Sequence, residues 1–169
     1  MKRILCIAVA LTILLLSFGC SNQKTEKPVK FYYIRADYTI GAEDSVISPE
    51  TRDASAYVSD QILLTQYLRG PKGNILVSPF PAGTALLDVD QTAHRFIVTL
   101  TDSFASLTGI DLTLACTALA MTCFQLTDLE EIEIKAETTL LDGDSSIIIN
   151  RASLSLVDEY SDATTATNS

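Results

Sequence analysis

The sequence predicts a two-layer α+β domain in which a sheet covers a buried helix. The segment 112–127 carries no charge. Within it, apolar side chains at steps of four and three form one stripe: Leu112, Cys116, Leu119, Cys123 and Leu126. The segment 131–137 alternates apolar and charged residues, which is the period of a strand with one buried face. A Thr-rich run of 16 residues is shorter than the roughly 20 aliphatic residues of a bilayer span, so we interpret it as a core helix.

The first 20 residues predict export and attachment to a lipid. A short basic start precedes the uncharged run 4–19, which is the form of a secretory signal. The run ends in Gly19-Cys20, and a small residue directly before Cys resembles the lipobox of bacterial lipoproteins, whose Cys is diacylated and becomes the first mature residue. The lipobox usually has Leu three positions before the Cys, where this chain has Ser17. Ordinary cleavage and a retained signal anchor are therefore alternatives.

The charge balance excludes several partners. Removing residues 1–19 takes away Lys2 and Arg3 and no acid, which leaves 10 basic and 21 acidic residues and a net charge of −11. Nucleic-acid binding needs clusters of Lys and Arg, so we do not expect this chain to bind nucleic acid. Anionic headgroups would repel such a chain, so membrane attachment is expected through the lipid on Cys20.

Composition divides the chain into four parts. Residues 1–19 are expected to be the lipoprotein signal peptide, and the polar segment 20–29 a flexible tether. A single domain is expected at 30–157, because about 150 mature residues suit one domain with tails. The last residues, 158–169, are rich in Thr, Ser, Ala and Asp, and we expect a disordered tail.

The remaining elements follow from changes of period and from turn residues. The predicted order is a strand at 29–38, a loop at 40–50, a helix at 52–68, a turn at 76–84, a hairpin of 84–91 and 94–101, the buried helix at 108–126, a strand at 131–137, and a hairpin of 138–141 and 146–149. Gly70 and Pro71 are expected to end the first helix. Asp142 and Gly143 supply the last turn.

Two local predictions concern the hairpin and the approach to the buried helix. On the strand 84–91 we expect Leu87 and Val89 to face the core, and Asp88 and Asp90 to face water. Asp102 or Ser103 is expected to cap a turn that leads towards the buried helix.

The order of motifs resembles the GerM domain, a module named for spore germination and sporulation lipoproteins of Gram-positive bacteria. The residues that carry the resemblance are Gly70, Pro71, Pro79, Pro81, Gly83, Thr84 and Thr122, followed by a strand at 128–134. Two features depart from the family pattern. Ala136 and Glu137 stand where an acidic residue and Gly usually close the last strand, and Cys123 replaces the usual Leu after Thr122.

The resemblance implies both a fold and a class of function. It implies a βαββαβ sheet like that of ring-building modules, with two helices packed on one face, and the chain adds a C-terminal hairpin. It also implies a non-catalytic interaction domain of the cell envelope without cofactors, acting in sporulation or germination. The expected partner is an envelope protein or a cell-wall component such as peptidoglycan. Self-association through an exposed sheet edge is a further mode of binding.

The candidate chemical groups have simpler interpretations. His94 is the only histidine and lacks a nucleophile motif, so we interpret it as a surface turn residue. Asp88, Asp90 and Asp102 lack the spacing of a calcium loop, and the sequence Asp142-Gly143-Asp144 fits a hairpin turn, so no metal site is predicted. Two remaining groups are interpreted as packing rather than as sites: the tyrosines Tyr32, Tyr33 and Tyr38, which could otherwise stack on sugars, and the free thiols of Cys116 and Cys123.

Two other functions remain as alternatives. The first is a cell-wall-active enzyme or regulator that uses surface carboxylates as acid and base, and a pair of carboxylates facing each other in a deep pocket would favour it. The second is a solute-binding lipoprotein, which would need a large apolar cavity.

Overall fold

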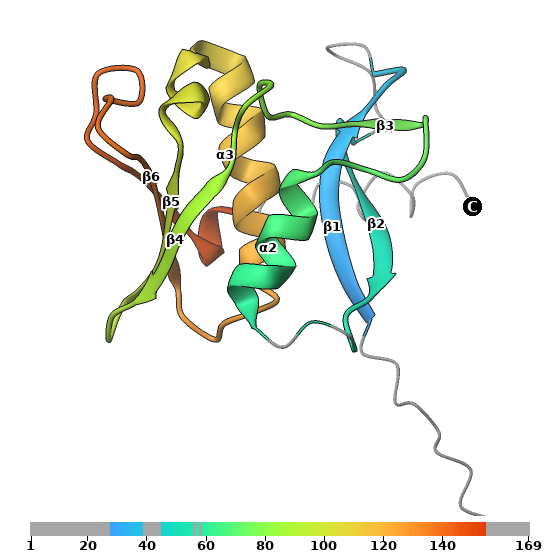
Figure 1. Cartoon of the computed structure of the whole chain (residues 1–169), viewed down its shortest axis with the longest axis horizontal. Helices are drawn as coiled ribbons and strands as arrows, with labels where there is room; N and C mark the ends of the chain where they lie inside the picture. The colour runs from blue at the N-terminus through green and yellow to red at the C-terminus, as the bar shows by residue number, and fades with distance from the viewer. Residues whose placement is uncertain (1–27, 39–44, 56, 58, 155–169) are drawn as a thin grey trace, which may run out of the picture.

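The computed structural model describes residues 28–38, 45–55, 57 and 59–154. Figure 1 shows the arrangement of the elements. The strands are β1 (Pro28–Arg35), β2 (Ile47–Asp53), β3 (Leu76–Val77), β4 (Leu86–Gln91), β5 (Arg95–Leu100), β6 (Glu131–Ala136) and β7 (Ile147–Asn150). The helices are α2 (Asp60–Leu68), the 3-10 helix η1 (Asp102–Ser106) and α3 (Gly109–Cys123). Strand β1 begins at Pro28, two residues before the expected start of the domain.

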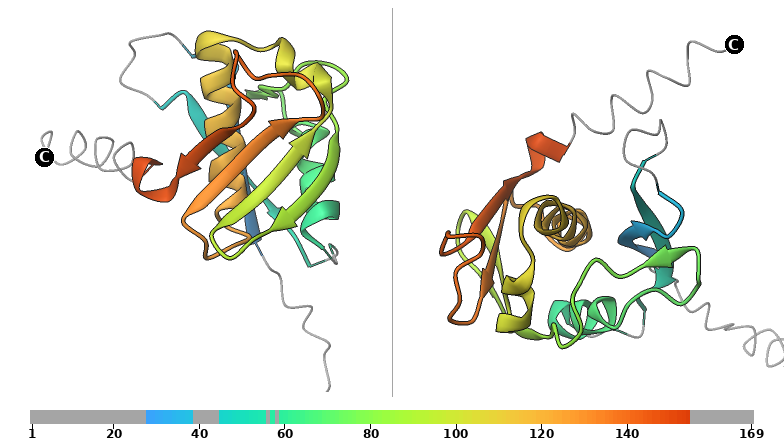
Figure 2. Two further views of the ribbon diagram at one scale, coloured as in Figure 1. Left: turned by 90° about the vertical axis from the view of Figure 1, so that its left-hand side faces the viewer. Right: turned by 90° about the horizontal axis from the view of Figure 1, so that it is seen from above.

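The strands form two sheets with helices between them (Figures 1 and 2). One sheet has the order β2-β1-β3 and the other the order β4-β5-β6-β7, in which β5 and β6 are parallel and the other neighbours antiparallel. The predicted α+β class and the order strand, helix, hairpin, helix, strand are confirmed. The division into two sheets differs from the expected arrangement of one sheet with helices on a single face.

Helix α3 can lie between two sheets because apolar and small side chains cover several of its faces. Four of the five predicted stripe residues are buried, with Leu112 at 4% exposure and Leu119 at 0%, while Leu126 is partly buried. The small residues between the stripe positions are buried as well, including Ala115, Ala118 and Ala120. Because these side chains are short, strands can approach α3 from more than one direction, and α3 contacts β1 as well as β6 and β7. The prediction of a water-shielded helix is therefore confirmed for Gly109–Cys123, whereas residues 124–126 form a turn after it.

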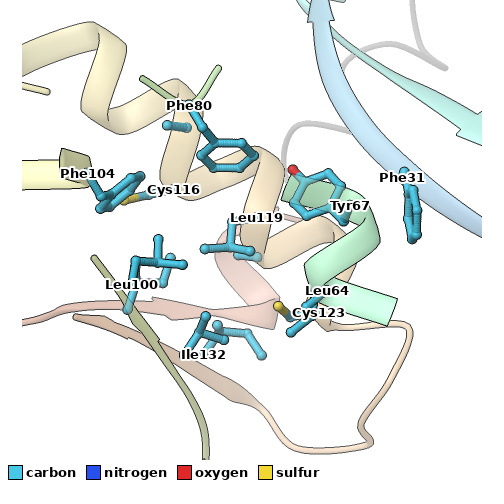
Figure 3. Packing of buried hydrophobic residues seen from close by; sticks show 14 of the residues in the cluster. Phe31, Leu64, Tyr67, Phe80, Leu100, Phe104, Cys116, Leu119, Cys123 and Ile132 are labelled. Atoms are coloured by element: carbon cyan, nitrogen blue, oxygen red, sulfur yellow. The ribbon is translucent and has the colours of Figure 1, made fainter. Parts of the chain in front are cut away.

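A row of aromatic rings runs from strand β1 through helix α2 to the 3-10 helix η1 (Figure 3). Tyr67 of α2 lies 5.4 Å from the ring centroid of Phe31 on β1 and 5.3 Å from that of Phe80. Phe80 in turn lies 6.2 Å from Phe104 of η1. Such pairs stabilise by about 0.5–1.5 kcal/mol beyond the burial of their area.

The predicted start of the first helix is wrong, and the predicted loop at 40–50 is wrong from Ile47 on, while residues 40–44 lie outside the described part of the chain. Residues 47–53 form the edge strand β2, and α2 begins only at Asp60, where the side chain of Ser59 accepts a hydrogen bond from the Ile62 N–H. In the sequence, Pro49 favours a loop. It is tolerated in β2 because an edge strand has one side on which no ladder donor is needed.

The predicted orientation of Leu87 is also wrong. The pairing of β4 with β5 shifts register between Leu86 and Asp88, which is a β-bulge. A bulge breaks the two-residue alternation, so Leu86 and Val89 pack against the core while Leu87 is 40% exposed.

Asp102 does not cap the turn that leads to α3. The cap position of η1 is Thr101, which makes no side-chain capping bond. The Asp102 carboxylate instead accepts hydrogen bonds from Thr138 N, Thr138 Oγ1 and Thr139 N at 2.9, 2.6 and 2.9 Å. It therefore holds the chain that leaves β6.

The final turn forms where the sequence predicts it. Asp142 and Gly143 have positive φ angles of 51° and 97°. The backbones of Leu141 and Asp144 exchange two hydrogen bonds. The strand partner of β7, however, is β6 rather than the segment 138–141.

Candidate interaction surface

The family-motif residues Gly70 and Pro71 hold a loop against β2. Gly70 has a φ of +92° and its carbonyl accepts a hydrogen bond from Arg52 Nη2 at 2.9 Å. Arg52 is only 8% exposed, and its guanidinium also donates to Glu50. The other oxygen of Glu50 accepts from the Lys72 N–H at 2.9 Å, so a partly buried ion pair holds the loop on both sides of Pro71.

The second motif segment places an aromatic side chain in the core. Between Pro79 and Pro81, the ring of Phe80 is 9% exposed and lies between Tyr67 and Phe104 (Figure 3). The two prolines fix φ on either side of this ring. The segment therefore contributes to the packing of the core.

Gly83 and Thr84 complete that turn. Gly83 has a φ of +88°, and a Cβ there would lie 3.1 Å from Ser103 Oγ. Its carbonyl accepts from Thr101 Oγ1 at 3.0 Å, and the Thr84 N–H donates to Pro81 O at 3.1 Å. Thr84 Oγ1 is buried and has no hydrogen-bond partner within the described part of the chain.

Thr122 and its neighbours close the second edge of β1. Strand β3 pairs with only the last two residues of β1. Further back, Thr122 Oγ1 accepts from the Tyr32 N–H at 3.1 Å, and Tyr67 Oη donates to Tyr32 O at 2.7 Å. Gln125 Oε1 accepts from the Lys30 N–H at 2.8 Å, and Gln125 Nε2 donates to Lys30 O. Side chains of α2 and of the end of α3 thus replace a neighbouring strand.

Strand β2 is a poor docking edge. The Arg35 N–H donates to Val46 O, which fixes the alternation of the β1–β2 ladder. The residues of β2 whose backbone groups point outward are then 47, 49, 51 and 53. Pro49 has no N–H, so the row of outward donors is interrupted at its second position.

Strand β4 is unsuitable for another reason. Its bulge lies between Leu86 and Asp88, and the exposed carboxylates Asp88 and Asp90 flank Val89. The outward Gln91 N–H is already bonded to Asp90 Oδ1 at 2.7 Å. Bulges and charges of this kind discourage the addition of a strand.

Strand β7 has none of these features. The Arg151 N–H donates to Glu130 O at 2.9 Å, so Ile147 and Ile149 exchange backbone bonds with β6, and the backbones of Ile148 and Asn150 point outward. Within the described residues β7 pairs only with β6, and Figure 2 (left view) shows it as the red-orange strand at the border of the sheet. Residues 145–150 carry no charge, and Ile148 is 44% exposed.

The sheet face beside β7 is covered by a neutralised ion-pair ladder. Arg95 Nε lies 2.7 Å from Glu131 and Arg95 Nη1 lies 3.4 Å from Glu133, whose other oxygen lies 3.1 Å from Lys135 Nζ. Burial alone would raise the pKa of Glu133, but hydrogen bonds from Lys135, Ser146 and Arg95 together hold it below its usual value. The carboxylates next to β7 therefore have cationic partners.

The carboxylates of this ladder differ in one respect from the acid and base of a glycosidase. A shallow groove of about 530 Å³ is lined by His94, Arg95, Glu130, Glu131 and Glu133. A general acid for glycoside cleavage needs a raised carboxyl pKa, whereas the pKa of Glu133 is lowered. In residues 28–154, excluding the undescribed gaps, no group of three or more His, Cys, Asp or Glu is placed to hold a metal ion.

The other predicted candidates are placed as follows. Tyr33 is fully buried and Tyr38 is 37% exposed, so the tyrosines do not form one sugar-binding platform. Cys116 and Cys123 are buried free thiols, as predicted, and burial raises the pKa of Cys116 to about 12.

Cys20, the predicted lipidation site, lies outside the described residues. No helix in the described part is long and apolar enough to cross a membrane.

Within the described residues, the structure therefore defines an α+β domain with two sheets, in which β7 is an uncharged edge strand. Its fold is similar to the first GerMN domain of the sporulation protein GerM from Bacillus subtilis, with a TM-score of 0.54 and 15% identity over 75% of this chain and 98% of that one. The tandem GerMN domains of the same protein also match, with a TM-score of 0.54 and 14% identity over 79% of this chain and 49% of that one. No protein-family model and no curated protein matches the sequence. The predicted resemblance to the GerM domain is confirmed as a likeness of fold.

Proposed function

We propose that this chain is an extracytoplasmic lipoprotein whose GerM-like domain binds an envelope protein by strand addition at β7. The observation that carries the proposal is the backbone of Ile148, which points out of the sheet on an uncharged, exposed strand. In strand addition, main-chain hydrogen bonds supply affinity and alternate side chains supply specificity. The fold of the sporulation protein GerM supports a role in sporulation or germination.

The expected anchor restricts where a partner can be. Pro28 follows Cys20 by eight steps along the backbone. At 3.3–3.6 Å per residue they reach roughly 26–29 Å when fully extended. A lipid on Cys20 would therefore keep the domain close to the membrane surface, which favours a partner in the envelope.

Lipid attachment can be tested by metabolic labelling. Cells that express the full chain are grown with an alkyne fatty acid, and the chain is compared with Cys20→Ala and with Cys6→Ala, a matched change of the other cysteine in the first 20 residues. We expect label in the wild type and in Cys6→Ala but not in Cys20→Ala. Equal label in both variants would contradict the anchor.

Partner binding can be tested by photo-crosslinking in intact cells. A photoreactive residue is placed at 148 on β7 or at 110 on α3, since Ile148 and Ile110 are 44% and 56% exposed. We expect a defined envelope product from position 148 only. The same products from both positions, or none from either, would remove the support for β7 as the binding edge.

The enzyme alternative has its own test. The chain is incubated with purified cell wall, alongside the variants Glu131→Gln and Glu133→Gln. We expect no release of soluble wall fragments by any of the three. Release by the wild type that either single substitution abolishes would favour the enzyme.

A further inference from the structure

We propose that the occupant of the β7 edge is a second copy of this chain, with the two β7 strands antiparallel about a two-fold axis at Ile148. This deepens the proposed function and rests on it, because both use the same edge. The argument depends on the register of the outward backbone groups, the local charge and the side chains that would meet.

The register of β7 is self-complementary. In an antiparallel pair, opposite residues exchange both N–H···O bonds only where their backbone groups face each other. On β7 these are the even-numbered residues, since Ile147 and Ile149 bond to β6. An axis at Ile148 pairs Ile148 with its own copy and Asn150 with Ser146 of the other copy, so every contact occurs twice, as a two-fold interface requires.

The outward carbonyl of Asn150 already accepts one hydrogen bond within the chain, and the proposed register does not depend on it. Asn150 O accepts from Ser153 Oγ at 2.6 Å. The Asn150 N–H remains available to donate to Ser146 O of the other copy. Both backbone groups of Ile148 are available, so the central pair of bonds is complete.

Local charge favours an identical strand as the occupant. The full chain has a net charge of −9, or −11 without residues 1–19, so two copies repel each other in most orientations. Residues 145–150 carry no charge, and the carboxylates of the adjacent strand β6, on Glu131 and Glu133, are paired with Arg95 and Lys135. A basic partner would instead be attracted to Asp88 and Asp90 on β4. An uncharged edge suits an uncharged strand, and β7 itself is one.

The side chains that meet also fit. On the outer face of the sheet, Ile148 would contact Ile148 of the other copy, which would cover a side chain that is 44% exposed. Cross-strand pairs of β-branched residues stabilise by about 0.2–1 kcal/mol each. Pairing so short a strand covers less than the roughly 1,200–2,000 Å² of a standard interface, so we expect a weak dimer that strengthens with salt, because salt screens the repulsion.

The test is cysteine crosslinking of the full chain in isolated membranes with a short bis-maleimide. In the proposed register the two Ile148 Cα atoms lie about 5.5 Å apart. The two Ser146 Cα atoms lie about 14 Å apart, four residues at about 3.4 Å each. We therefore expect a covalent dimer from Ile148→Cys and a much weaker one from Ser146→Cys alone. Co-expressed Ser146→Cys and Asn150→Cys chains with different tags should give a mixed dimer.

Controls separate this register from random encounter. The wild type controls for the native cysteines, and Ile110→Cys and Leu140→Cys place thiols at positions whose native side chains are 56% and 55% exposed. We expect no dimer from these three. Adding Ile148→Lys to both co-expressed chains should abolish the mixed dimer because two cations meet at the axis, whereas Ile148→Thr should keep it.

The outcomes distinguish the two proposals. A dimer from Ile148→Cys together with the mixed dimer supports the second copy. If Ile148→Cys gives no dimer, or the control positions give as much, the second copy is overturned. If Ile148→Cys crosslinks only to another envelope protein, the second copy is again overturned, but binding at the β7 edge stands.

Discussion

Replacing Thr122 by Val should test whether α3 completes the edge of β1. The change keeps the shape and the β-branched helix propensity, and removes the acceptor of the Tyr32 N–H, 3.1 Å away in the native structure. A buried donor left without a partner costs about 1–3 kcal/mol. With a urea dependence of about 1–3 kcal/mol per molar for a small domain, a loss near 2 kcal/mol lowers the midpoint by about 1 M.

The measurement is urea unfolding of residues 21–169, followed by hydrogen exchange of the Tyr32 amide, which should become faster. Thr117→Val on the same helix is the matched control. Thr117 Oγ1 also bonds to the carbonyl four residues earlier, Thr113 O at 2.8 Å, and within the described residues it makes no hydrogen bond to β1. Thr122 Oγ1 makes the equivalent bond to Ala118 O. Equal losses from Thr122→Val and Thr117→Val would refute the role assigned to Thr122.

Two further predictions concern Gly83 and Asp102. Gly83→Ala should destabilise by about 1–3 kcal/mol in thermal unfolding, because φ is +88° and the new Cβ would lie 3.1 Å from Ser103 Oγ. Gly73→Ala, which has open space, should be neutral or stabilising, and equal effects would contradict this. Hydrogen bonds from the Thr138 side chain and the backbones of Thr138 and Thr139 lower the pKa of Asp102 from 3.8 to about 2. The contribution of Asp102 to the free energy of unfolding is therefore fully present above pH 3.8 and is lost as the pH falls towards 2. The stability curves of wild type and Asp102→Asn should converge near pH 2, and parallel curves would count against the prediction.

The elements with an uninterrupted period could be predicted from the sequence. The strands β5 and β6 and the helix α3 follow their apolar patterns, because one repeated spacing decides which face is buried. The start of α2 was missed because the cap residue Ser59 comes well after Pro49, Glu50 and Thr51, which also resemble a helix start. The inward turn of Leu86 was missed because a bulge changes the alternation without a distinctive residue.

The division into two sheets could not be predicted from periodicity. A period tells which side of a strand is buried, but not which strand lies beside it. The signals in this chain were the small residues Ala115, Ala118 and Ala120, which allow α3 to be covered on several faces. The polar side chains of Thr122 and Gln125, near the end of that helix, gave no sign that they would bond to the backbone of β1.

The motif residues were predicted as a group but not in their roles. Gly70 and Gly83 have positive φ angles, and Thr122 bonds to a strand, so the features that carry the resemblance to the GerM domain are structural. The candidate binding residue, Ile148, was not identified. The available signal was the run 145–150, uncharged in a chain with 21 acidic residues.

Two sheets expose more edges than one, and the described chain deals with these edges differently. Strand β2 contains Pro49, β3 has only two residues, and β4 has a bulge and two exposed carboxylates. A protein that only had to avoid aggregation would be expected to protect β7 in a similar way, for example with Lys or Pro. Three consecutive isoleucines stand there instead, the middle one with its backbone directed outward. Protection of the other edges together with an unprotected β7 is the pattern expected when one edge is reserved for a partner strand.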